Sequence, residues 1–157
     1  MNEYFLARAL HVVAIVFWIG GVAFVTTVLL PAVRRLREPA EQLYLFEQIE
    51  SSFALQARWA TLLAGASGFW LVHKLDAWPR FVDPGYWWMH AMVLLWLVFS
   101  LMLFVLEPLW LHRWFRTRAS RDPVGSLDLV IIFHRVLLTF SVITLMGAAA
   151  GSHGWIS

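Results

Sequence analysis

Four long apolar stretches constrain the fold of this 157-residue chain more than any other feature. A helix needs about 20 mostly apolar residues to cross the hydrocarbon layer of a membrane. We therefore expect membrane-spanning helices over about 5–33, 58–75, 86–111 and 127–151. The composition agrees, because 61% of the residues are hydrophobic and 14% are charged, whereas a soluble domain is about half apolar and about a quarter charged.

The spans predict an all-α integral membrane protein, a single transmembrane domain over residues 1–157 built as a four-helix up-down-up-down bundle. Between the first two spans, apolar residues recur at helical spacing: Leu43, Phe46, Ile49 and Phe53. This pattern predicts an amphipathic helix over about 40–57. Such a helix either lies on the membrane surface or extends the second span.

The basic residues predict the orientation of the spans. They concentrate in the first and third connections, as Arg34, Arg35, Arg37, Arg58, Arg113, Arg116, Arg118 and Arg121. The opposite side has only Arg8, Lys74 and Arg80. The positive-inside rule then places both termini outside, which is the periplasm for the inner (cytoplasmic) membrane of a bacterium. We expect the first helix to be retained rather than cleaved as a signal peptide.

Charge and cysteine content exclude several function classes. The net charge of +2 is small, and the basic residues of the chain lie near the ends of expected helices. We therefore expect no nucleic-acid partner. The chain has no Cys, which excludes disulfides, iron–sulfur clusters and thiolate metal sites. The expected partners are the lipid bilayer and a redox partner protein or quinone. Faces of small residues also suit a homodimer or a subunit of a larger membrane complex.

Each expected span brings one histidine to the outer leaflet, and these are His11, His73, His90 and His153. His11 and His90 lie inside apolar runs, where an unpaired polar group costs several kcal/mol by hydrocarbon transfer, or about 1–2 kcal/mol by measurements on proteins. A hydrogen bond between the two imidazoles would satisfy them, and a shared ligand would satisfy them better.

Haem b is the ligand that we expect. Two imidazoles at matched depth on facing helices meet the requirement for bis-histidine ligation of haem iron, with His11 and His90 as the pair. His73 and His153 are alternates or a second pair, and Arg8 and Arg80 lie on the correct side for the propionates. Small residues either make room for the macrocycle or serve close helix packing: Gly20, Gly21, Ala64, Gly65, Ser67, Gly68 and the run from Gly147 to Gly151.

Copper is the alternative ligand at the same place. The stretch "WWMHAM" puts the thioethers of Met89 and Met92 beside His90, and soft Met and His ligands suit copper(I). The interpretation without a metal is packing of these methionines in the core or against lipid.

A second polar group is expected at the inner side, made by Glu107, His134 and Arg135 with Arg58 nearby. The simplest interpretation is an ion pair between Glu107 and Arg135 or Arg58 that fastens helices together. A proton path, or a second haem held by His134, is the functional alternative.

Two stretches resemble a known group of small membrane proteins. "LARALHVVAIVFWIGGVAF" resembles the first helix shared by CopD-type copper-resistance proteins and HemJ-type protoporphyrinogen oxidases, and "GYWWMHAM" resembles the start of the third HemJ helix. The HemJ resemblance implies a haem-associated membrane oxidase that uses the histidine at His11. That type also carries a functional lysine two residues after the third-helix histidine, where this chain has Met92. The CopD resemblance implies copper handling from the periplasm.

The leading hypothesis is a membrane cytochrome b that passes electrons between a periplasmic partner and quinone or another membrane redox protein. Whether it also turns over a substrate, as a haem-dependent membrane oxidoreductase, stays open. The alternatives are copper transport or delivery of CopD type, a HemJ-like protoporphyrinogen oxidase, and a structural subunit whose histidines are only hydrogen-bonded.

Overall fold

The computed structural model describes residues 2–155, except the side chains of residues 2, 110–112, 115 and 116. The described residues form helices joined by short turns, with no strand among them. The α-helices are α1 (Asn2–Phe24), α2 (Leu30–Val33), α3 (Pro39–Lys74), α4 (Trp87–Leu101), α5 (His112–Ala119) and α6 (Pro123–Ser152). Two π-helical segments, η1 (Val25–Leu29) and η4 (Met102–Leu111), and two short 3₁₀ turns, η2 (Trp78–Phe81) and η3 (Pro84–Tyr86), complete the order.

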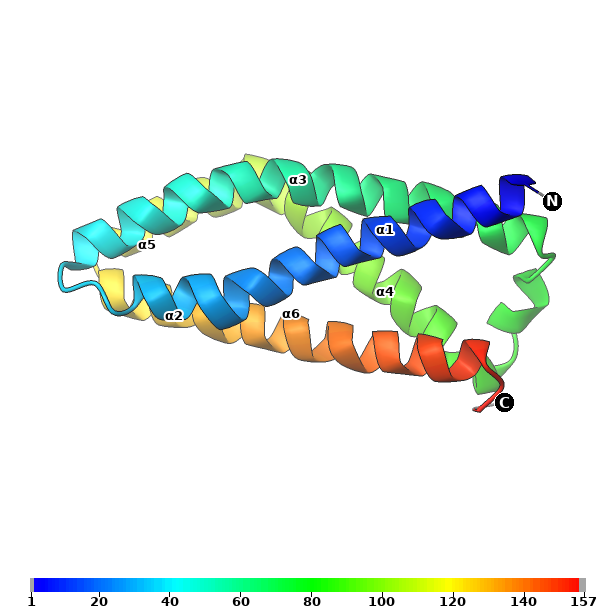
Figure 1. The fold of residues 1–157 in the computed structure, drawn as a ribbon. Coiled ribbons are helices and arrows are strands. Elements are labelled where there is room, and N and C mark those ends of the chain that lie inside the picture. The colour runs from blue at the N-terminus through cyan, green and yellow to red at the C-terminus, as the bar shows by residue number, and fades with distance from the viewer. Residues whose placement is uncertain (1, 156–157) are drawn as a thin grey trace.

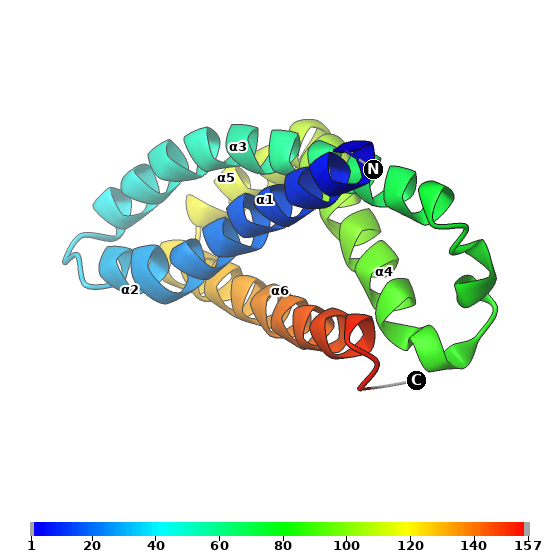
Figure 2. The same cartoon turned by 45° about the vertical axis from the view of Figure 1, so that its right-hand side comes forward.

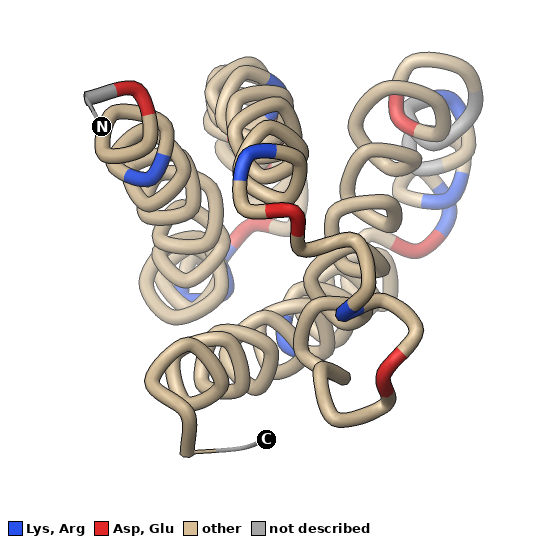
Figure 3. The backbone as a smooth tube through the Cα atoms, turned by 90° about the vertical axis from the view of Figure 1, so that its right-hand side faces the viewer, with Lys and Arg blue, Asp and Glu red and all other residues tan. Residues whose placement is uncertain are grey.

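The helices run alternately along the long dimension of the molecule (Figure 1). Both chain termini and the connection of residues 75–86 lie at one end, which we call the terminal end. The connections of residues 34–38 and 120–122 lie at the other, which we call the turn end. Long stretches of the helices carry no charged residue (Figure 3).

Three helices of the described part of the chain are long and apolar enough to cross a membrane: Glu3–Val33, Pro84–Leu109 and Pro123–Ser152. The second expected span, 58–75, is helical but lies within α3 and is not among the three. The apolar run is too short, because Arg58 limits it at one end and His73 and Lys74 limit it at the other. The chain has the helices of a membrane protein.

The expected amphipathic helix is the first half of α3, which runs without a break over 36 residues. Residues 40–57 and the expected second span therefore belong to one continuous helix. Phe46 is only 2% exposed and packs into an apolar cluster with Leu30 and Val33 of α2. Burial against α2 fixes this segment within the fold, and it does not lie apart as a surface helix.

The helices associate mainly as two pairs, α1 with α3 and α4 with α6. Figure 2 shows α4 crossing from the C-terminal end of α6 toward α3. Where α1 and α4 meet, Trp18 and Phe99 pack edge to face with ring centroids 5.0 Å apart at 89°. The contact between the first and third expected spans is thus filled by aromatic rings, in a core that also contains Ala14, Val22 and Ala64.

Both prolines inside long helices accompany π-helical turns. Pro31 follows η1 by two residues, and the first helix continues past it to Val33. Pro108 lies within η4. Proline has no N–H and its ring crowds the preceding turn, and the wider π turn relieves that crowding. At Pro108 this arrangement leaves a backbone carbonyl that another helix uses.

Candidate functional site

His11 finds its partner on α3. Its Nδ1 lies 3.0 Å from the carbonyl oxygen of Ala64 and 3.1 Å from Oγ of Ser67. The ring lies against Gly68, where a Cβ atom would be 3.0 Å from Cε1 of His11. Small residues on α3 therefore let the imidazole approach the backbone closely.

This contact fixes which ring nitrogen carries the hydrogen. A carbonyl oxygen only accepts, so Nδ1 of His11 donates to Ala64 and Nε2 keeps its lone pair. No hydrogen bond to Nε2 occurs among the described residues. A histidine that ligates a metal shows this pattern, because its second nitrogen usually donates to a carbonyl or carboxylate.

His90 is engaged differently. Its Nε2 lies 2.9 Å from the carbonyl oxygen of Phe81 and its Nδ1 lies 3.3 Å from that of Tyr86. Both carbonyls only accept, and a neutral imidazole has one donor, so the shorter contact to Phe81 is the hydrogen bond. The ring also packs edge to face on Phe81 with centroids 5.6 Å apart. His90 is exposed and holds the 75–86 connection on α4.

The other expected residues at the terminal end make local contacts. His73 is exposed in the last turn of α3, and His153 lies 2.8 Å from the carbonyl of Ala149 on its own helix. Arg8 approaches the hydroxyl of Tyr4 at 3.5 Å, and Arg80 lies over the ring of Tyr86 at 5.3 Å. Among the described residues, no hydrogen bond joins His11 to any of these side chains.

A metal-binding cluster is not formed by the described side chains. Among them, no group of three or more His, Asp or Glu lies close enough to hold a metal ion. On α4, His90 and Met92 are two residues apart and so point to different faces, while Met89 is only 5% exposed and belongs to the core. The assignment of Met89 and Met92 as copper ligands stays a prediction.

Aromatic rings occupy the space beside most of the small residues. Phe53 lies on Gly21, Trp96 on Gly65, Trp87 on Gly147 and Trp88 on Gly151, each so close that an added Cβ would overlap the ring. Trp96 also donates from Nε1 to the carbonyl of Thr61 at 2.9 Å. Close packing is therefore what these glycines serve in the structure.

Near the middle of α3, Arg58 makes two contacts with the third expected span. Its Nη2 lies 3.1 Å from Oε1 of Glu107, and its Nε donates to the carbonyl of Leu103 at 3.0 Å. In a π-helix each N–H donates to the carbonyl five residues earlier, and Pro108 has no N–H. The carbonyl of Leu103 therefore lacks its helical donor, and Arg58 replaces it.

The inner polar group is thus divided among different partners. Of the two expected ion pairs, the one between Glu107 and Arg58 is observed. His134 contacts the carbonyl of Val130 on its own helix at 2.9 Å, and Arg135 lines a separate pocket. The described contacts do not join Glu107, His134 and Arg135 into one site.

Glu50 of α3 interacts electrostatically with Glu107, and the sequence did not indicate this interaction. Its pKa is raised to about 7, mainly by burial and also by the negative charges of Glu107 and Glu47. In the sequence, Glu47 and Glu50 lie opposite the apolar residues Leu43, Phe46 and Phe53 of the expected amphipathic helix. In the structure α3 contacts η4, and this contact brings Glu50 within electrostatic range of Glu107.

Comparison with known proteins adds no relative: no family model matches the sequence, and no curated protein or solved structure gives a significant match. Functional inference therefore rests on the side chains of this chain, with His11 as the residue whose environment is the most specific.

Proposed function

We propose that this chain is a membrane-embedded b-type haem protein that transfers electrons, with His11 as its anchored iron ligand. The supporting observation is the contact between Nδ1 of His11 and the carbonyl of Ala64 at 3.0 Å, which leaves the Nε2 lone pair for a metal. A bound haem supplies one-electron redox chemistry. The helices contribute ligation, a fixed ring orientation and a surrounding of low polarity.

The candidates for a second ligand differ in the hydrogen bond that each would lose on binding iron. His90, the partner proposed from sequence, would have to release the carbonyl of Phe81. His73 has no described hydrogen bond to release and lies on α3, the helix that already holds His11. His153 would release Ala149. We keep His90 as the proposed pair and His73 as the alternate that requires the least rearrangement.

The proposed topology places the terminal end in the periplasm and the turn end in the cytoplasm of a bacterial inner membrane. It rests on the basic residues of the turn end, such as Arg34, Arg35 and Arg121. The second half of α3 would complete the up-down-up-down bundle as its second span, with its polar residues turned toward α1 and α4. Electrons would pass between a periplasmic partner and quinone or another membrane redox protein.

The first experiment is an absorption spectrum of the detergent-purified protein, made with ample haem, in oxidised and dithionite-reduced forms. A Soret band with sharp reduced α and β bands would support low-spin six-coordinate haem. A featureless visible spectrum would reject the proposal. Copper measured in the same sample would then identify the CopD-like alternative, and product formation from protoporphyrinogen with a quinone acceptor would identify the HemJ-like one.

Variants then assign the ligands. His11→Ala should abolish haem retention, and full haem content in that variant would reject His11 as the ligand. His90→Ala and His73→Ala should differ from each other: the true second ligand shifts the spectrum to a high-spin form when replaced, and the other leaves it unchanged. His134→Ala is the matched control, because His134 lies on α6, where its ring contacts the carbonyl of Val130 and packs edge to face on Phe133.

A further inference from the structure

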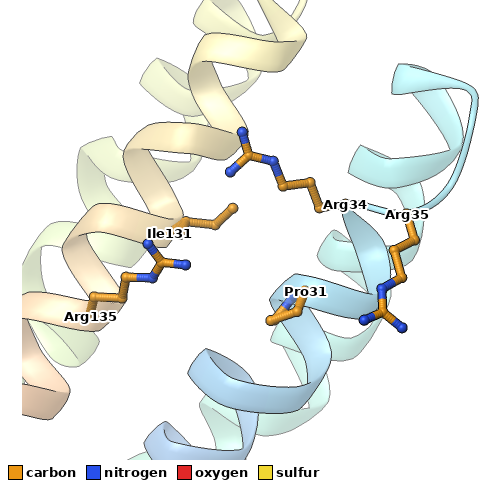
Figure 4. Close-up of a pocket in the computed structure, with 5 residues that line it drawn as sticks. All are labelled: Pro31, Arg34, Arg35, Ile131 and Arg135. Atoms are coloured by element: carbon orange, nitrogen blue, oxygen red, sulfur yellow. The ribbon is translucent and has the colours of Figure 1, made fainter.

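A pocket of about 240 Å³ lies between α2 and α6 at the turn end. Figure 4 shows the five residues that line it, Pro31, Arg34, Arg35, Ile131 and Arg135. Pro31 and Ile131 form an apolar wall. The three arginines bring positive charge to a surface that the proposed haem site does not use.

The arginines are oriented unequally. In Figure 4 the side chain of Arg34 extends toward α6 and that of Arg135 turns back beside Ile131, while Arg35 points away from both. Arg34 pairs with Asp128 on α6, with Nη2 and Oδ1 3.0 Å apart. Arg135 forms no ion pair within the described part of the chain. Asp128 thus neutralises Arg34 and leaves Arg135 without an opposite charge among the described residues.

Arg135 lies where an unpaired charge is costly. It belongs to the apolar helix Pro123–Ser152, about 10 Å further along the axis than Asp128 at 1.5 Å per residue. Charged residues at such depth pair with an opposite charge or reach toward the interface. Ile132 lies on the same flank of α6 and is 61% exposed, so the surface beside the pocket is apolar and suited to lipid.

We infer that an anionic phospholipid binds at this pocket, with its phosphodiester held by the guanidinium groups of Arg34 and Arg135 at the pocket's margin and an acyl chain against the apolar pocket surface. The planar guanidinium matches two phosphate oxygens at once, and basic pockets between spanning helices bind such headgroups. The acyl chain would lie along Pro31 and Ile131. This inference depends on placement in a membrane but not on haem, so either proposal can fail without the other.

The test is lipid binding to the full chain in nanodiscs of phosphatidylcholine with graded phosphatidylglycerol, followed by release into mild detergent and native mass spectrometry. The wild-type protein should retain one phosphatidylglycerol in preference to phosphatidylcholine. The double variant Arg34→Gln/Arg135→Gln should lose affinity by about tenfold or more. Equal retention of the two lipids, or full retention by the double variant, would overturn the inference.

Two further arms make the result specific. The double variant Arg37→Gln/Arg121→Gln removes the same charge from the turn end outside the pocket and should bind within about twofold of wild type. Asp128→Asn frees Arg34 and should tighten binding, a gain that misfolding cannot produce. Displacement of the lipid by millimolar inorganic phosphate would indicate a site for free phosphate and would overturn the lipid assignment.

Discussion

The two ends of the molecule are held together by different chemistry. Toward the terminal end, uncharged groups join the helices: Trp87 on Gly147, Trp88 on Gly151, and His11 on the backbone at Ala64. From the middle of α3 to the turn end, charged groups do so, through Arg58 with Glu107 and Arg34 with Asp128. The same chain thus uses ring-to-glycine packing in one region and ion pairs in the other.

This difference follows from where each kind of group is tolerated. Aromatic rings and neutral imidazoles lose little when water is excluded, and the ring nitrogens of Trp96 and His11 each bond to a backbone carbonyl. Ion pairs keep part of their hydration near an interface, and the side chains of Arg58 and Glu107 are still 32% and 25% exposed. We therefore expect the packing of the terminal half to be insensitive to salt, and the region from Arg58 to the turn end to respond to both salt and pH.

The largest effect is expected for Arg58→Leu. The substitution leaves the carboxylate of Glu107 and the carbonyl of Leu103 without their partner, and breaking a pair of this kind in a mostly buried place costs about 2–4 kcal/mol. The apparent free energy of unfolding in mixed detergent–SDS micelles measures it. Glu107→Gln should cost less, because Arg58 keeps its bond to Leu103. Equal costs for the two variants would contradict the role given to that carbonyl.

Gly65→Ala tests the packing of the terminal half. A Cβ at position 65 would lie 2.5 Å from Nε1 of Trp96, and displacing the indole weakens its bond to Thr61, at a cost of about 1–3 kcal/mol. Gly20→Ala is the matched control, since nothing lies within 4 Å of its added Cβ. That control should gain up to about 1 kcal/mol from helix propensity. Similar unfolding free energies for both variants would argue against ring-to-glycine packing.

Glu50 should make the stability of the turn end depend on pH. Its pKa is raised in the fold from 4.5 to about 7, so the folded state holds the proton more tightly than the unfolded state. Stability therefore falls as pH rises from about 4.5 to about 7 and is level above that, by about 1–2 kcal/mol after allowance for residual solvent contact. Glu50→Gln should remove this fall and be more stable than wild type at pH 8.

Measurement of unfolding midpoints from pH 5 to pH 8 separates Glu50 from the other carboxyls. Glu41→Gln is the control, because Glu41 lies exposed in the first turn of the same helix. It should follow the wild-type pH profile. A Glu50→Gln profile with the same slope as wild type would remove Glu50 as the cause.

The sequence predicts where helices exist better than it predicts which residues meet. Apolar length and prolines located the long helices within a few residues, because both signals are local. Fusion of the amphipathic segment with the second span stayed open, since it depends on the burial of Phe46 against α2. The ion pair between Glu107 and Arg58 was one of two named alternatives, and only the arrangement of the helices selects it.

The candidate site shows the same limit. The sequence indicates that His11 needs a partner, but the carbonyl of Ala64 carries no signal of its own, because every residue has one. The partner of His90, Phe81, lies in a 3₁₀ turn whose course is set by tertiary contacts. The donor role of Arg58 toward Leu103 requires a π-helix around Pro108, which hydrophobic periodicity does not reveal.

The smallest effect is expected for the ion pair between Arg34 and Asp128 at the turn end. Asp128→Asn breaks the contact with Arg34, whose side chain is 54% exposed against 41% for Asp128. Exposed pairs contribute little, so the unfolding free energy should change by about 0.5 kcal/mol or less, and less still at high salt. Measured beside Arg58→Leu in the same micelles, this variant separates two ion pairs of nearly equal length. A large loss for Asp128→Asn would mean that burial does not decide how much a pair contributes at this end.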